Sequence, residues 1–322
     1  MSDVLLECVP NFSEGRDPAV IQAITDAIRS VDGVWLLDVD PGKATNRTVV
    51  TFVGAPEPVL EAAVRGAKKA AELIDMRGHS GEHPRFGALD VCPLVPVAGL
   101  TLEETVPWAH KLARRLADEV GLTIYCYEAA ATRLERKNLA YVREGEYEGL
   151  ARRMAQPEHS PDYGPATFNA KSGATAVGAR DFLVAYNVTL NTTSTRRANA
   201  IAFDIREKGR QKLENWKPVV DEQGQPVWIP GSLKAVKAIG WYIPEYGVAQ
   251  ISINLTDISV TPMHTAVAGA SVINGGLYVD PTFYPRSLDE AQAKAVRVLR
   301  PETSDKMRYL FRLNADRKST RL

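Results

Sequence analysis

Residues 34–53 read VWLLDVDPGKATNRTVVTFV, and this stretch decides the fold. Apolar residues dominate both of its ends, whereas Asp40 to Thr45 between them have the composition of a turn. The stretch therefore predicts two neighbouring strands, Val34–Val39 and Arg47–Val53, joined as a hairpin.

The elements expected on either side of this hairpin complete a known order. Val4–Val9 reads as a strand, and apolar residues from Ala19 to Ile28 fall at helical spacing. An alanine-rich helix is expected from the prolines at 56 and 58 through Leu73, and the apolar run Ala88–Val97 offers a closing strand. The order strand, helix, strand, strand, helix, strand is the split βαβ pattern of a ferredoxin-like domain.

A second, similar pass follows in the other half of the chain. The first half continues with a helix (102–120) and a strand (122–127), and a stretch rich in Pro, Gly, Ser, Ala and Thr (156–178) reads as a linker. The second pass comprises a strand (182–190), a helix (195–208) and two strands (235–242 and 248–258). We therefore predict two ferredoxin-like α+β subdomains, 1–178 and 179–322, with helices on mostly antiparallel sheets and a ligand cleft between them.

Composition predicts a globular protein without a charged macromolecular partner. The chain has 322 residues, with 39 Lys and Arg balancing 39 Asp and Glu, which favours neither nucleic acid nor an anionic membrane. The N-terminus lacks the pattern of a signal peptide, and no apolar run approaches the length that spans a bilayer. Three cysteines without C-x-x-C spacing are typical of small buried side chains in a reducing compartment, so we expect a cytoplasmic protein.

Residues 75–90, DMRGHSGEHPRFGALD, contain two of the five histidines among glycines and a proline. Histidine is the side chain best suited to take and give a proton near neutral pH, which indicates a reactive loop. His79 and His83 also fit the zinc pattern H-x-x-E-H, but that pattern needs a helix, and the glycines and Pro84 disfavour one. A third interpretation is that both histidines only cap a turn.

Two acidic residues precede the hairpin turn on a strand that is otherwise apolar. Asp38 and Asp40 are two positions apart, so in a strand both carboxylates point to the same face. They could hold the tautomer of a histidine, pair with a cationic substrate, or only cap the edge of the sheet.

Taken together, several motifs resemble the formiminotransferase family, the glutamate formimidoyltransferases, including the transferase part of formiminotransferase-cyclodeaminase. The resemblance covers residues 1 to about 264, in order and at family spacing, and the motifs are CVPNFSEG (8–15), LLDVD (36–40), TNRTV (45–49), GEHPR (81–85), ALDVCP (88–93) and GWY (240–242).

The resemblance implies a set of site residues. The catalytic histidine of the family matches His83, and its acidic partner matches Asp40. Its folate-binding segment matches Gly164, Pro165, Ala166, Thr167, Phe168, Asn169, Ala170, Lys171, Ser172 and Gly173. The chemistry of this segment suits a ligand clamp, because glycines admit close backbone approach, Phe168 can stack on a ring and Lys171 can meet a carboxylate.

The implied reaction transfers the formimino group of N-formimino-L-glutamate to tetrahydrofolate during histidine degradation. Both substrates carry carboxylates, for which Arg47 and Arg85 are the best candidates, although both could equally form surface ion pairs. No nucleotide motif is present, and neither a nucleotide nor a metal is expected. The alternatives are a folate-dependent transferase with another formimino or formyl donor, and a non-catalytic folate-binding protein.

The resemblance also implies a homodimer. The chain departs from the family after His264, and a helix is expected at residues 307–312 of the basic tail. The sequence contains the transferase part alone, so a cyclodeaminase is expected to be a separate protein.

Overall fold

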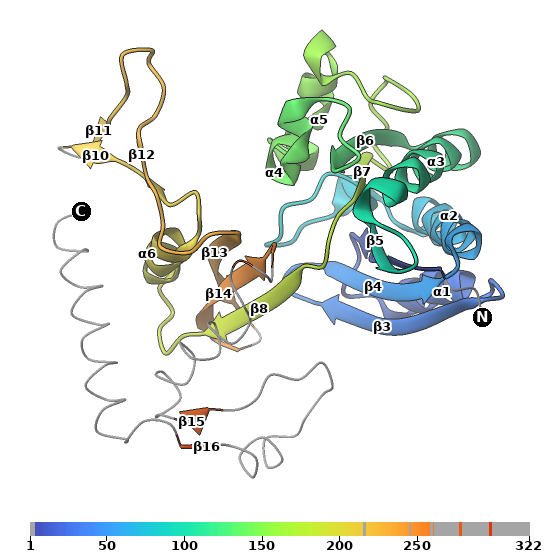
Figure 1. Ribbon diagram of the computed structural model, residues 1–322, viewed down its shortest axis with the longest axis horizontal. Coiled ribbons are helices and arrows are strands. Elements are labelled where there is room, and N and C mark those ends of the chain that lie inside the picture. Colours follow the sequence, from blue (N-terminus) through green and yellow to red (C-terminus); the bar gives the residue numbers. More distant parts are fainter. Residues whose placement is uncertain are drawn as a thin grey trace. The chain divides into compact units, whose positions relative to one another are not determined.

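A computed structural model describes residues 4–214, 217–244, 246–257 and 260, together with two short strands, β15 (Leu277–Tyr278) and β16 (Val296–Arg297). The chain divides into two compact units, the first ending at Asp181 and the second beginning at Phe182 (Figure 1). The expected helix at 307–312 lies outside the described residues, and so do the expectations for the chain after His264.

The first unit is built on one seven-stranded sheet. Its strands are β1 (Leu5–Cys8), β2 (Asn11–Phe12), β3 (Val34–Gly42), β4 (Arg47–Gly54), β5 (Leu89–Ala98), β6 (Thr123–Glu128) and β7 (Ala174–Ala179). β3, β4, β1 and β5 pair antiparallel in that order, which is the ferredoxin-like order expected from the sequence. β7 and then β6 extend the sheet in parallel beyond β5.

Three helices cover one face of this sheet: α1 (Pro18–Arg29), α2 (Pro56–Leu73) and α3 (Leu102–Val120). Each has a local reason to begin where it does. Asp17 accepts hydrogen bonds from the first turn of α1, a proline opens α2, and Thr101 and Glu104 form a capping box on α3. Their apolar faces join Leu6, Phe52 and other strand residues in the main hydrophobic core.

The other face of the sheet is covered by an insertion between β6 and β7. It comprises η2 (Leu134–Lys137), α4 (Leu139–Val142), α5 (Glu146–Met154) and η3 (Pro157–His159). Side chains alternate along β6, so Ile124 and Cys126 enter the main core, whereas Tyr125 and Tyr127 enter a second core with Val142 of the insertion. The insertion therefore packs on the face opposite the three long helices.

The predicted linker at 156–178 is wrong for its last part. Ala174–Ala179 forms β7, a strand between β5 and β6 in which all six residues are buried. Its small residues are required by crowding, since a Cβ atom on Gly178 would lie 2.6 Å from the ring of Tyr127. Because β7 consists largely of alanine and glycine, its composition resembles that of a loop, although the strand lies inside the sheet between β5 and β6.

The second unit repeats the first four elements of the ferredoxin-like pattern. Its elements are β8 (Val184–Thr189), α6 (Thr195–Ile205), β13 (Val236–Ile243) and β14 (Val248–Leu255). The strand order β13-β14-β8 is antiparallel and corresponds to β3-β4-β1 of the first unit. Short ribbons formed by β9 (Arg210–Gln211), β10 (Leu213–Glu214), β11 (Lys217–Pro218) and β12 (Trp228–Ile229) lie between α6 and β13 in the chain.

The fold is thus mixed α/β with mostly antiparallel sheets, as the sequence predicts. Helix α6 ends at Ile205 rather than at Lys208. The expected ligand cleft between the two subdomains stays a prediction. Within the described residues, no helix combines the length and the apolar character needed to cross a membrane.

The three cysteines are free and buried, as their apolar surroundings predict. The sulfur atoms of Cys8 and Cys92 lie 3.6 Å apart, and burial raises the pKa of the Cys8 thiol well above its ordinary value. Burial also raises the pKa of Cys126 to about 12. All three cysteines therefore pack as small side chains of the core.

Gly240 of β13 lies against α6, where a side chain has no room. A Cβ atom there would lie 2.4 Å from the backbone nitrogen of Asn199. The side-chain amide of Asn199 also donates to the carbonyl of Gly240 at 2.8 Å and accepts from its backbone N–H at 3.0 Å. We expect Gly240→Ala to lower the free energy of unfolding of the second unit by about 1–3 kcal/mol, measured by urea denaturation. Gly78→Ala, at a position with open space, is the control, and an equal loss in both variants would contradict the packing argument.

Candidate functional site

The histidine loop, residues 75–90, runs from η1 (Met76–Gly78) to the start of β5 without an α-helix. The β3–β4 turn holds its centre. The side-chain amide of Asn46 donates to the carbonyl of Ser80 at 3.0 Å, and the backbone N–H of Glu82 donates to the carbonyl of Ala44 at 3.2 Å. Gly81 is required here, because a Cβ atom would lie 2.2 Å from the carbonyl oxygen of Thr45.

His79 has a structural position in this loop. Its Nε2 donates to the carbonyl of Asn46 at 2.8 Å, and its Nδ1 accepts from Nε of Arg85 at 3.3 Å. Both ring nitrogens are therefore engaged within the protein. Since the H-x-x-E-H segment is also not helical, the geometry of the zinc pattern is not formed.

His83 is held as a neutral imidazole of one tautomer. Its Nδ1 lies 2.7 Å from the carbonyl oxygen of Pro84, which can only accept, so Nδ1 carries the proton and Nε2 the lone pair. Burial is the largest cause that lowers the pKa of His83 to about 3, and the charges of Arg47 and Arg143 act in the same direction. At pH 7 the ring is neutral, the state that a proton acceptor requires.

Asp90 is a fully buried carboxylate held between two guanidinium groups. Its Oδ2 accepts from Nη1 of Arg47 and, at 2.9 Å, from Nη1 of Arg143, while its Oδ1 accepts from the backbone N–H of Phe86 at 3.0 Å. Burial raises the pKa of Asp90, but the charges of Arg143 and Arg47 outweigh this effect and leave it below its ordinary value. One carboxylate and two guanidinium groups leave an excess of one positive charge beside His83.

Arg85 ties the histidine loop to the insertion. Its guanidinium donates to Glu148 at 2.6 and 2.9 Å and to Glu146 at 3.0 Å, and the backbone N–H of Tyr147 donates to the carbonyl of Arg85 at 3.0 Å. The role predicted for Arg85, binding a substrate carboxylate, stays a prediction, but the protein's own carboxylates already occupy this group. Arg47 likewise pairs with Asp90.

Asp40 lies on β3, where it pairs with Val49 of β4. Burial is the largest cause that raises the pKa of Asp40, and the negative charge of Asp38 acts in the same direction. The carboxylate whose charge acts on His83 is Asp90. The assignment of Asp40 as the acidic partner of His83 stays a prediction.

The predicted folate-binding segment, residues 164–173, lies directly beside the histidine loop. The carbonyl of Ser172 accepts from the backbone N–H of Ala88 at 2.9 Å, and the N–H of Ala174 donates to the carbonyl of Phe86 at 3.1 Å. Gly173 has a φ of +64°, and a Cβ atom there would lie 2.1 Å from the Phe86 carbonyl oxygen. The structure thus brings together two segments that are about 80 positions apart in the chain.

Two side chains of this segment have defined neighbours. Phe168 packs on Tyr147 of α5 with ring centroids 5.6 Å apart, and Nζ of exposed Lys171 donates to the carbonyl of Glu72, at the end of α2, at 2.8 Å. The tyrosine hydroxyl also donates to the carbonyl of Ala170 at 2.6 Å. The insertion therefore supports this segment as well as the histidine loop.

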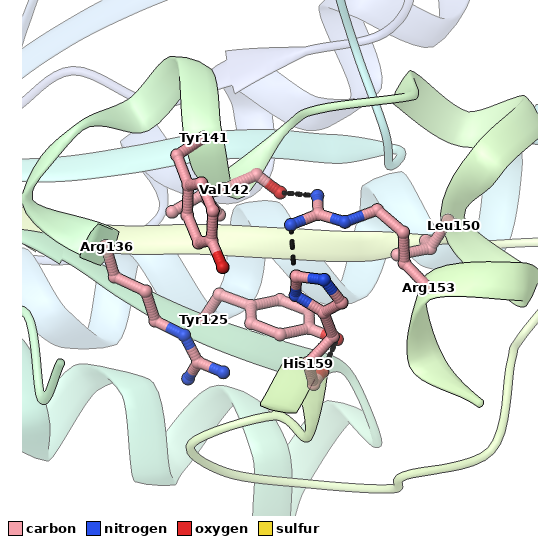
Figure 2. Close-up of a pocket in the computed structure, with 7 residues that line it drawn as sticks. All are labelled: Tyr125, Arg136, Tyr141, Val142, Leu150, Arg153 and His159. Atoms are coloured by element: carbon pink, nitrogen blue, oxygen red, sulfur yellow. Dashed lines mark hydrogen bonds between the residues drawn. The ribbon is translucent and has the colours of Figure 1, made fainter. Parts of the chain in front are cut away.

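A small pocket lies between the insertion and strand β6 (Figure 2). It is lined by Tyr125, Arg136, Tyr141, Val142, Leu150, Arg153 and His159. Both of its arginines are engaged: Arg136 pairs with Asp162 at 2.7 Å, and Arg153 donates to the carbonyl of Val142 at 2.8 Å. The side chains that line this pocket therefore hold the end of α4 in place, and we do not interpret the pocket as a second reactive centre.

Two family models match the chain. One is described as "Formiminotransferase domain, N-terminal subdomain" and matches residues 5–180, and the other, "Formiminotransferase domain", matches residues 185–273. The chain belongs to the formiminotransferase family.

Named relatives of this formiminotransferase chain are of two kinds. It is 42% identical over 264 residues to "Glutamate formimidoyltransferase" of Thermoplasma acidophilum, covering 81% of this chain and 80% of that protein. It is 50% identical over 262 residues to "Formimidoyltransferase-cyclodeaminase" of Sus scrofa and 48% identical over 261 residues to that of Dictyostelium discoideum. The chain spans 45% and 46% of the length of these last two relatives, and each match covers 81% of the chain.

Sequence reasoning missed several residues that contact or lie near the histidine loop in this formiminotransferase. Asp90 carried a signal, since an acid within the apolar run 88–97 is a charge placed in a buried strand. Arg143, Glu146 and Glu148 carried none, because they lie in an insertion more than 50 positions further along the chain.

Proposed function

We propose that this chain transfers the formimino group of N-formimino-L-glutamate to tetrahydrofolate, giving 5-formimidoyltetrahydrofolate and L-glutamate in histidine degradation. The proposal rests on the named glutamate formimidoyltransferase relatives. The observation that carries it is His83, a neutral imidazole of fixed tautomer in a loop whose backbone is hydrogen-bonded to the segment 164–173. Further parts of the proposal are the subdomain division at 178/179, drawn from the repeated pattern of elements, a cytoplasmic location, drawn from the N-terminus and the cysteines, and a homodimer, drawn from the family resemblance.

In this mechanism His83 carries one proton between two nitrogens. A secondary ring amine of tetrahydrofolate attacks the amidine carbon, and the new bond leaves the ring nitrogen cationic. Nε2 of His83 takes its proton and returns it to the glutamate nitrogen, whose bond to the carbon then breaks. Asp40 is proposed to stabilise the cationic species electrostatically.

The positive charge around His83 suits substrates that carry carboxylates. A bound carboxylate near Arg47 would offset the field of the Arg47–Asp90–Arg143 cluster and raise the pKa of His83 towards neutrality. The imidazole would then become a stronger base when substrate is present. Arg85 is proposed as a weaker second contact.

The test is turnover of the purified protein with tetrahydrofolate and N-formimino-L-glutamate, followed as glutamate release, with and without a chelator. Release that resists the chelator would support acid-base catalysis by His83. No release from a folded protein that binds tetrahydrofolate would favour another formimino or formyl donor, or a binding role, and a panel of donors separates these two.

Lys171 provides a test of the proposed folate segment. Because a charge-assisted contact to a carboxylate contributes roughly 1.5 kcal/mol or more, Lys171→Ala is expected to raise the Kd for tetrahydrofolate about tenfold and to leave kcat within a few-fold. Isothermal titration calorimetry measures the change, with Lys137→Ala, an exposed lysine of η2, as the control. An unchanged Kd would remove Lys171 from the binding site.

A further inference from the structure

Arg143 reaches from the insertion to the backbone beside His83. Its Nη1 donates to the carbonyl of Pro84 at 3.0 Å and to Oδ2 of Asp90 at 2.9 Å. The same Pro84 oxygen accepts from Nδ1 of His83 at 2.7 Å. The guanidinium and imidazole nitrogens are therefore less than about 6 Å apart, since both bond to one oxygen.

The backbone that carries Arg143 is fixed on both sides. Nη1 of Arg153 donates to the carbonyl of Val142 at 2.8 Å and to that of Glu144 at 2.9 Å. Figure 2 shows this arginine bonded at once to Val142 and to His159, the pocket residue on η3. Arg143 is thus presented to the histidine loop from a rigid support.

The placement of Arg143 carries a cost as well as the gain from its pairing with Asp90. Nε of Arg143 is buried and lacks a hydrogen-bond partner in the part of the chain that the structure describes. Leaving a buried donor unpaired costs about 1–3 kcal/mol. A side chain kept in place at such a cost is a candidate for a role in function.

We infer that Arg143 is a positioning residue for His83: its bonds to the Pro84 carbonyl and to Asp90 hold the imidazole as the Nδ1-protonated tautomer with Nε2 as the proton acceptor. The role of Arg143 in catalysis rests on the proposed function. Its effect on the tautomer of His83 can be tested independently of that function. Charged groups that act on the ring include Arg47 of β4, Asp90 of β5 and Arg143 after α4. The charge of Arg143 also disfavours protonation of the ring, which helps to keep the imidazole neutral.

Nitrogen-15 NMR of the histidine side chains tests the tautomer without any substrate, with His83→Ala assigning the signal among five histidines. Wild-type protein is expected to show Nδ1 protonated. In Arg143→Gln we expect a mixture of tautomers and a titration midpoint higher by about one pH unit or more, because one nearby positive charge is removed. Arg143→Lys keeps the charge and one donor, and should stay close to wild type.

Arg152→Ala, an exposed arginine of α5, is the control and should change neither quantity. A wild-type tautomer and midpoint in Arg143→Gln would overturn the inference. A midpoint in Arg143→Lys that moves by about one pH unit or more from the wild-type value would also overturn the inference. This comparison needs only wild type and Arg143→Lys, so it remains possible if Arg143→Gln does not fold.

Kinetics supply the second readout. Arg143→Gln is expected to lower kcat 10- to 100-fold, to keep KM for the donor within a few-fold, and to move the acid limb of the pH profile to higher pH. A change in KM alone would assign Arg143 to substrate binding and overturn the positioning role. Wild-type protein without turnover, but with the expected NMR result, would count against the proposed function and not against the role of Arg143.

Discussion

His83→Ala is expected to lower kcat at least about 100-fold, because positioned acid-base groups contribute about 100- to 10,000-fold. The Kd for tetrahydrofolate should remain within a few-fold, since the proposed folate segment, 164–173, takes its hydrogen bonds from other residues of the loop, among them Ala88. Glutamate release measures the first quantity and isothermal titration calorimetry the second.

The matched control is His110→Ala on α3, which removes a second half-buried histidine and its contact with Tyr163. This variant should keep wild-type turnover. Wild-type turnover in His83→Ala would remove the proposed role of His83, and a parallel loss of folate affinity would show that His83 acts mainly in binding.

Asp90→Asn is expected to lower the free energy of unfolding by about 3–5 kcal/mol at pH 7, because it leaves two buried guanidinium groups without their counter-charge. The effect should depend on pH. Asp90 has a folded-state pKa below its ordinary value, so its contribution is present above the unfolded-state pKa of about 3.9 and is lost as the pH falls through the folded-state pKa.

The difference between wild type and Asp90→Asn should therefore narrow below about pH 4, as followed by urea denaturation across pH. Asp26→Asn is the control, since Asp26 pairs with Arg29 where both side chains are more than half exposed, and it should cost less than about 1 kcal/mol. Equal losses in the two variants would show that the buried cluster contributes no more than a surface ion pair.

The order of the elements could be predicted because the apolar periodicity of each was strong. The hairpin formed by β3 and β4 and the strand β8 appeared where the sequence placed them, although β3 extends to Gly42. β7 was not predictable, because this buried strand consists mainly of small residues and has no pattern of large apolar side chains.

The candidate site was predictable only where its chemistry is local in sequence. Two histidines among glycines marked the loop, but the choice of His83 over His79 needed either the family resemblance or the contacts of His79 with Asn46 and Arg85. Arg143 meets Asp90 across 53 positions of the chain, and no spacing rule connects residues so far apart.

The bonds that hold the histidine loop also bear on the order of events in folding. They include the bond of Asn46 with Ser80, 34 positions apart, and the bond of Arg85 with Glu148, 63 positions apart. Closing such long chain segments is entropically costly and slow compared with forming α1 or α2 from local contacts. Helices α1 and α2 can therefore form while the loop is still open, and during synthesis the bonds between the loop and the insertion form only after the insertion has left the ribosome.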